Sequence, residues 1–241
     1  MTRTQVTVFP SAAALAEGVA ELFALRAAES AQERGRFRVA LAGGGTPIAA
    51  YRRLAASPWA ELVPWRAVEV FFGDERCVGE CDLERNDAAA REAFLLKVPI
   101  PPENVHPIPA LAPDAADRYE ALLRDRLGAP APELPVFDLV LLGVGEDGHT
   151  ASLFPGHPVL GETTRLVARV DGAPKAPPSR VTFTLPLLNA ARSVVFVVSG
   201  GAKRSAIGRV LAGDPALPAA CVRPAGGERL FFLDRGAAGE D

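Results

Sequence analysis

The chain has 241 residues, of which 49% are hydrophobic and 23% charged, and its formal net charge is −3. This length fits one large domain whose core needs no disulfides, and the composition is ordinary for a globular protein. No apolar run is long enough to span a bilayer, and the slightly negative charge argues against nucleic acid as the main partner, because proteins that bind it usually present a basic face.

The N-terminus and the cysteines bear on the location of the protein and on metal binding. The N-terminal segment carries Arg3 but no continuous apolar stretch and no transit-peptide character, which predicts a cytoplasmic protein. Cys77, Cys81 and Cys221 form an odd, sparse set, without a second cysteine pair or a nearby histidine to complete a zinc site. The sequence therefore predicts no metal, no cofactor and no membrane or nucleic-acid partner, in a monomer or a small homo-oligomer.

Segments of strand and helix character alternate along the chain. Ser11 is placed to cap a long helix that Gly35 ends, and Pro113 and Gly128 bound a later helix in the same way. The predicted strands are short apolar runs rich in β-branched residues. In chain order we expect strand 7–9, helix 11–34, strand 37–41, helix 47–54, strand 68–72, helices 84–96 and 112–127, strands 140–142, 166–170, 180–185 and 193–199, a helix ending at 211, and strand 229–234.

This alternation predicts an α/β fold with a mostly parallel sheet. No internal repeat or interdomain linker is visible, so residues 1–241 are predicted to form a single domain, with a disordered tail over about 236–241. Ligands of such sheets bind beyond the carboxyl ends of the strands. The residues that follow the predicted strands are therefore the candidate site.

Two glycine-rich junctions follow predicted strands. Gly43–Pro47 joins a strand to a helix, and Gly200–Lys203 does so again with a lysine in the first turn. Glycine lets backbone N–H groups approach an anion, and a helix N-terminus adds partial positive charge. The first junction thus predicts a phosphate site. The alternative is a tight turn that simply needs glycine; neither junction matches a dinucleotide or nucleoside-triphosphate motif.

Charged side chains follow two other strands. Asp74–Arg76 come directly after one predicted strand, where they must face either solvent or a polar pocket. A later strand ends in a glycine-rich loop that carries Glu146, Asp147 and His149. The ordinary pKa of histidine, about 6.5, suits a general base near neutrality. Either Glu146 or Asp147 would orient this histidine, and the sequence leaves both open.

Five motifs occur in order along the chain. They are GGGTP (43–47), GDER (73–76), GVGEDGHTASLFPGHP (143–158), PPSRVTFTLP (177–186) and SGGAK (199–203). Together they resemble the 6-phosphogluconolactonase family, within the glucosamine-6-phosphate isomerase/deaminase-like superfamily. The similarity runs from near the N-terminus to about Arg223. The third motif is highly specific, whereas the short glycine-rich motifs alone are not.

This resemblance implies a Rossmann-like three-layer αβα sandwich and the metal-independent hydrolysis of 6-phospho-D-glucono-1,5-lactone in the oxidative pentose phosphate pathway. Hydrolysis of an ester needs a base, a stabiliser of the oxyanion and groups that hold the substrate. The resemblance implies His149 as the base that activates water. The further implied roles are support of His149 by Asp147, binding of the lactone or its oxyanion by Arg76, binding of phosphate by Gly44, Gly45, Thr46, Arg180 and Lys203, and binding of hydroxyls by Asp74 and Asn86.

One position separates the chain from the deaminase branch of the superfamily. That branch resembles the chain up to the histidine but carries a glutamate five positions later, which helps to open the sugar ring. Here the position is Phe154, and a phenyl ring cannot relay a proton. Of the other histidines, His106 is expected to be structural and His157 to shape the rim of the site, and the proline-rich loop over 171–179 has the composition of a lid.

Two non-catalytic alternatives belong to other classes. A sugar-phosphate sensor would need an attached DNA-binding module, and the N-terminal helix, followed directly by a sheet strand, leaves no room for one. A scaffold protein with a decayed site would not retain the polar residues of the motifs. The sequence therefore favours the enzyme.

Overall fold

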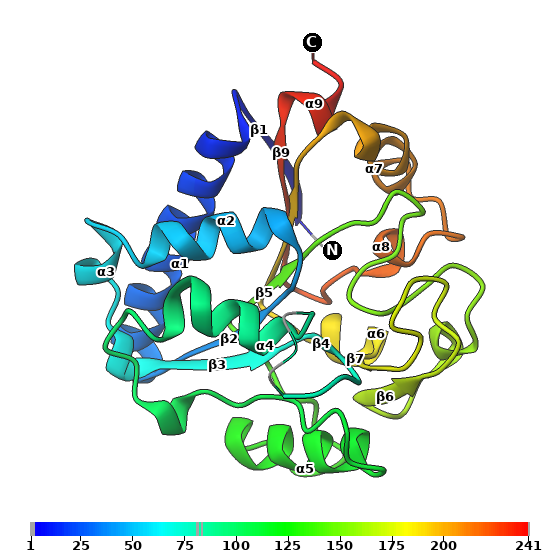
Figure 1. Ribbon diagram of the computed structural model, residues 1–241, viewed down its shortest axis with the longest axis horizontal. Coiled ribbons are helices and arrows are strands. Elements are labelled where there is room, and N and C mark those ends of the chain that lie inside the picture. The colour runs from blue at the N-terminus through cyan, green and yellow to red at the C-terminus, as the bar shows by residue number, and fades with distance from the viewer. Residues whose placement is uncertain (1–2, 81, 83, 241) are drawn as a thin grey trace.

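The computed structural model describes residues 3–80, 82 and 84–240 and builds them around a six-stranded parallel sheet (Figure 1). The strand order is β1-β9-β8-β5-β2-β3, and every neighbouring pair is parallel. The chain therefore changes its direction across the sheet at β5, which lies between β2 and β8. The strands are β1 (Arg3–Phe9), β2 (Phe37–Leu41), β3 (Val68–Phe72), β5 (Leu139–Leu142), β8 (Ser193–Val198) and β9 (Glu228–Asp234).

The central strands are buried on both faces, as parallel strands covered by helices usually are. Every residue of β3, β5 and β8 is buried. The charged exception in β3 is Glu69, which forms ion pairs with Arg36 and Arg38 at the amino end of the sheet. The apolar sequence of these strands thus supplies the core.

Helices cover the sheet on both sides, and the predicted Rossmann-like three-layer αβα sandwich is confirmed (Figure 1). α1 begins as predicted at Ser11, whose side chain accepts the Ala14 N–H, and ends at Gly35 with φ 73°. The helices are α1 (Ala12–Arg34), α2 (Gly45–Leu54), α3 (Trp59–Leu62), α4 (Asn86–Ala90), α5 (Ala115–Leu127), α6 (Leu185–Leu188), α7 (Arg204–Leu211), α8 (Pro218–Cys221) and α9 (Arg235–Ala238).

A second, antiparallel sheet in the order β4-β7-β6 was not predicted. Its strands are β4 (Asp74–Arg76), β7 (Arg180–Phe183) and β6 (Val167–Val170). β4 is short and highly charged, so its sequence does not read as a strand, and its partner β7 lies far along the chain. This sheet matters for function because it carries charged side chains to the edge of the main sheet.

Three other predictions need correction. The helix expected over 84–96 begins at Asn86 and passes into a π-helical turn over Arg91–Leu95. The helix expected over 112–127 begins at Ala115, with Asp114 as its N-cap. Part of the tail expected to be disordered over about 236–241 lies in α9, because the Asp234 side chain accepts the Ala237 N–H at 2.8 Å and caps the helix.

Among the described residues, none of the helices is both long and apolar enough to cross a membrane. The same part of the chain contains no cluster of three or more His, Cys, Asp or Glu side chains that could hold a metal ion. Cys77 and Cys221 are free thiols, and Cys81 lies outside the described residues.

Candidate active site

A cavity of about 230 Å³ opens at the carboxyl ends of β2, β5 and β8. Ligands bind at this edge of open α/β sheets, where the strand order reverses. Its walls come from the loops after these strands, from β4 and β7, and from the start of α4. The lining residues are Ala42, Gly43, Gly44, Gly45, Thr46, Pro47, Asp74, Arg76, Asn86, Gly143, Val144, Gly145, His149, Ala151, Arg180, Val197, Val198, Ser199 and Lys203.

The junction between β2 and α2 turns the start of a helix toward the cavity. Gly44 is the N-cap, with φ 97°, a conformation that favours glycine, and its lack of a side chain leaves the first turn without a side-chain cap. Gly43 is equally constrained, because a Cβ there would lie 1.8 Å from Asn86 Oδ1. The N–H groups and partial positive charge of the first turn of α2 are therefore available to an anion.

The end of β8 repeats this geometry. Gly200 also has φ 97°, and its N–H donates to Asp234 Oδ1 at 3.0 Å. A 3₁₀ turn over Gly201–Lys203 leads into α7, and Lys203 Nζ lies 3.5 Å from Glu146 Oε1. The glycine-led start of α2 and the ammonium group of Lys203 thus lie at the same cavity, whereas Gly200 and Gly201 do not line it.

His149 and Asp147 form a close pair after β5. Asp147 Oδ1 lies 2.5 Å from His149 Nδ1 and also accepts the His149 backbone N–H at 3.3 Å. Gly145 permits this packing, since a Cβ there would lie 2.0 Å from His149 Nδ1. Glu146, the alternative left open by the sequence, is exposed and pairs with Lys203 instead. The acid that contacts His149 is Asp147.

Phe154 forms the floor beneath the histidine. Its buried ring lies 4.9 Å from the His149 ring, centroid to centroid, and 5.7 Å from the Arg180 guanidinium carbon. Burial lowers the pKa of His149 below its ordinary value of 6.5; the hydrogen bond and charge of Asp147 oppose this shift, and the charge of Lys175 adds to it. Burial alone would raise the pKa of Asp147, but the contact with His149 outweighs it and the pKa is lowered. At neutral pH the pair is therefore a neutral imidazole beside a carboxylate.

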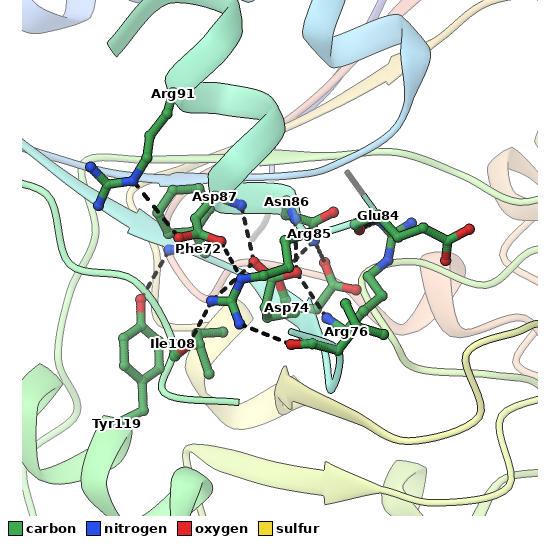
Figure 2. Close-up of polar contacts among 12 residues, drawn as sticks. Phe72, Asp74, Arg76, Glu84, Arg85, Asn86, Asp87, Arg91, Ile108 and Tyr119 are labelled. Atoms are coloured by element: carbon green, nitrogen blue, oxygen red, sulfur yellow. Dashed lines mark hydrogen bonds and ion pairs between the residues drawn. The ribbon is translucent and has the colours of Figure 1, made fainter. Parts of the chain in front are cut away.

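β4 and α4 form the opposite wall (Figure 2). Asn86 Nδ2 donates to the Asp74 backbone oxygen at 2.8 Å and to Asp74 Oδ1 at 3.1 Å, and Ser152 Oγ donates to Asp74 Oδ2 at 2.6 Å. The Arg76 guanidinium donates through Nη1 to the Glu84 carbonyl. Arg76 Nε and Asn86 Oδ1 are buried but have no hydrogen-bond partner among the described residues. Both residues line the cavity, but these two atoms are themselves buried.

Arg180 lies beside Arg76, because the two residues are direct partners in the β4–β7 ladder. Burial and the charge of Arg76 lower its pKa. Its guanidinium donates to three carbonyls of the loop expected to act as a lid, those of Lys175, Ala176 and Pro177, each at 3.1 Å. Like charges on paired strands repel, so the two arginines create a strongly positive wall that favours an anionic ligand.

The structure brings the predicted site residues together. All of them line the cavity except Asp147, which reaches it through His149. His106 lies outside, buried with its ring 4.6 Å from that of Phe71, and His157 contacts the Asp171 carbonyl near the loop. Ser152 was not predicted to belong to the site, although it lies in the third motif; the only signal in the sequence is its position close to His149.

This combination of fold and site defines a class: a parallel α/β protein whose strand-end cavity places the glycine-led start of a helix beside a His–Asp pair. A family model described as Glucosamine-6-phosphate isomerases/6-phosphogluconolactonase matches residues 10–231. The chain belongs to this family, as its motifs predicted.

Relatives are similar over almost the whole chain. The 6-phosphogluconolactonase of Synechocystis sp. is 42% identical over 245 residues, covering 98% of this chain and 98% of that protein. The 6-phosphogluconolactonase of Rattus norvegicus is 43% identical over 238 residues, covering 97% and 92%. A solved structure of 6-phosphogluconolactonase from Trypanosoma brucei is 30% identical, with a TM-score of 0.88 and coverage of 99% of both chains.

Proposed function

We propose that the chain hydrolyses 6-phospho-D-glucono-1,5-lactone to 6-phospho-D-gluconate, a step of the oxidative pentose phosphate pathway. The observation that carries the proposal is a cavity that combines a His–Asp pair with the glycine-led start of α2 and with Lys203. The names of the relatives support the substrate. The proposal includes a cytoplasmic, single-domain protein that acts as a monomer or a small homo-oligomer.

In the proposed mechanism His149 is the general base. Asp147 accepts the Nδ1–H at 2.5 Å, which leaves Nε2 unprotonated and able to take a proton from water. The resulting hydroxide attacks the lactone carbonyl carbon and forms a tetrahedral oxyanion. When the bond to the ring oxygen breaks, the imidazolium returns its proton to that oxygen, and the product is a hydroxy acid that ionises. No metal takes part in these steps.

The proposed substrate orientation follows from the charges around the cavity. The phosphate lies against Gly44, Gly45 and Thr46 at the N-terminus of α2, with Lys203 and Arg180 supplying positive charge. The lactone end then reaches His149, with its oxyanion at Arg76 Nε. Asp74 and Asn86, which both line the cavity, bind the hydroxyls of the sugar.

Phe154 supports hydrolysis over ring opening. It occupies the position of the deaminase glutamate and packs against the His149 ring at 4.9 Å. A hydrocarbon ring orients the imidazole but offers no proton to a sugar ring oxygen. The site therefore contains a base for water without the second acid–base group that isomerisation needs.

The decisive experiment is a coupled assay that supplies freshly made 6-phosphogluconolactone and detects 6-phosphogluconate. Because the lactone also hydrolyses spontaneously, only the rate above that background counts. We expect an enzyme-dependent rate that scales with protein concentration. A rate equal to the background at all protein concentrations would overturn the proposed function.

The pH dependence of kcat/KM should report His149. Its pKa lies below 6.5 because burial disfavours the imidazolium, and the base works only when neutral. The contribution of His149 to activity is therefore expected to be lost as the pH drops through a value below 6.5. Because Asp147 raises this pKa, the Asp147→Asn variant should be less active and should lose this contribution at still more acidic pH. An acid limb that does not shift in Asp147→Asn would contradict the assignment.

Phosphate recognition should depend on Lys203. Removal of a hydrogen bond to a charged group costs about 1.5–3 kcal/mol, so Lys203→Ala is expected to raise KM for the phosphorylated lactone by roughly 10–100-fold with little change in kcat. The unphosphorylated gluconolactone should be hydrolysed equally by the variant and the wild type. The control is Lys97→Ala, which removes an ammonium group that donates to the Ala93 carbonyl and does not line the cavity. Equal losses with both lactones would rule out a phosphate contact.

A further inference from the structure

Glu75 is a buried carboxylate at the centre of β4. Its neighbours Asp74 and Arg76 both line the cavity, whereas Glu75, fully inaccessible to solvent, points to the other side of the strand. Glu75 itself does not line the cavity. Burial of a carboxylate destabilises the folded state unless the group is hydrogen-bonded. The hydrogen-bond partners of Glu75 therefore indicate its role.

Those partners are backbone N–H groups of β4 and α4. Glu75 Oε1 accepts from the N–H groups of Arg76 at 2.9 Å and Asn86 at 2.7 Å, and Oε2 accepts from that of Asp87 at 3.0 Å. The Arg85 guanidinium lies 3.9 Å from Oε2. Burial raises the pKa of Glu75 to about 7, against the opposing effect of these N–H donors and Arg85. The carboxylate thus satisfies donors at the start of α4 that have no partner within the helix.

These bonds fix the two cavity residues that still have unpaired atoms. Arg76 and Asn86 each donate their backbone N–H to the same oxygen, Oε1. Arg76 Nε and Asn86 Oδ1 are the buried donor and acceptor without partners among the described residues. Figure 2 shows that the side chains of Arg76 and Asn86 come from different elements, the strand β4 and the start of α4. The position of Arg76 relative to Asn86 therefore depends on the contacts that hold β4 against α4, which include the hydrogen bonds of Glu75.

We propose that Glu75 is a positioning residue, whose carboxylate ties β4 to α4 and so sets the spacing of Arg76 and Asn86 around the reacting lactone. This inference rests on the proposed function for the identity of the ligand. The hydrogen bonds by which Glu75 links β4 to α4 are present in the chain without a ligand. Glu75 acts on the reaction through the backbone, because it does not reach the cavity.

The test is Glu75→Gln, which keeps the size of the side chain but turns an N–H donor toward backbone N–H groups. Misplacement of a reacting group by about 1 Å can lower the rate by roughly 10²-fold. We expect kcat to fall by about that factor, with KM within about threefold of the wild type, because the phosphate contacts at α2 and Lys203 are untouched. Unchanged kcat in a folded variant would overturn the inference.

Glu69→Gln is the matched control. Glu69 is another buried carboxylate paired with arginine, but it lies at the amino end of β3, away from the cavity. The Glu69→Gln variant should have a lower thermal unfolding temperature than the wild type but an unchanged kcat. An equal fall in kcat for both variants would mean that Glu75 serves only stability. Should Glu75→Gln fail to fold, Glu75→Asp, which keeps the charge but is one methylene shorter, should show the same kcat-specific loss.

Amide hydrogen exchange separates this inference from the proposed function. The Asn86 and Asp87 amides should exchange faster in Glu75→Gln than in the wild type and Glu69→Gln, with no substrate present. Unchanged exchange rates of these amides would overturn the proposed link between β4 and α4, independently of which substrate the enzyme hydrolyses. Conversely, a wild type without lactonase activity would overturn the proposed function while faster exchange still supported the tie.

Discussion

The His149→Ala variant is expected to lose roughly 10²–10⁴-fold in kcat/KM for 6-phosphogluconolactone, the usual contribution of a general base. His149 is the titratable side chain in the cavity whose pKa suits proton transfer near neutrality, and Asp147 fixes its ring from 2.5 Å. Alanine removes the base but leaves the phosphate contacts, so the loss should fall mainly on kcat. Binding of 6-phosphogluconate, measured by calorimetry, should change little.

The control is His157→Ala, which removes a histidine of the same motif that does not line the cavity. It should retain kcat/KM within a few-fold. The rate must be measured above the spontaneous hydrolysis of fresh lactone, and thermal unfolding must show that both variants are folded. Near wild-type kcat/KM in His149→Ala would remove this histidine from the reaction and leave the proposed mechanism without a base.

The sequence predicted which residues would meet in the cavity because the rule involved is topological. GGGTP, the Asp147–His149 loop and SGGAK each follow a buried apolar run. In a parallel sheet the carboxyl ends of such strands share one edge, so their convergence needs no knowledge of side-chain contacts. The strand order β8-β5-β2 then places the three loops side by side.

The sequence did not predict contacts that depend on the path of the chain within a loop. Glu146 and Asp147 are adjacent and chemically alike, so their spacing to His149 does not distinguish them. A tight turn determines which of the two acids contacts His149. In this turn the Gly145 N–H donates to the His149 carbonyl at 2.9 Å and Gly148 adopts φ 80°. This turn directs Asp147 inward and leaves Glu146 with Lys203.

Glu75 shows a second reason for failure. Its charge and its charged neighbours read as a solvated loop, whereas it is fully buried. The partners that satisfy it are backbone N–H groups of Asn86 and Asp87, which any residue would supply. Side-chain patterns therefore contain no signal for it, and only the three-dimensional placement of α4 reveals the tie.

Arg76→Lys is expected to lower kcat by roughly 10²–10³-fold, the usual loss on removal of one oxyanion donor. Arg76 Nε is a buried donor at the cavity wall without a partner in the described part of the chain. Lysine keeps the positive charge but has a methylene group where arginine has Nε. The substitution therefore separates a placed hydrogen-bond donor from a general positive field, which Arg180 and Lys203 also supply.

The expected signature is a loss in kcat that exceeds any change in KM, because the oxyanion exists only in the transition state and the intermediate. Arg66→Lys, an exposed arginine in the 3₁₀ turn over Trp65–Ala67, is the matched control and should behave as the wild type. If Arg76→Lys raised KM alone, Arg76 would instead bind the ground state, as a further contact to the phosphate. Retention of full activity would show that positive charge at this wall suffices, and Arg76 Nε would then not be the oxyanion donor.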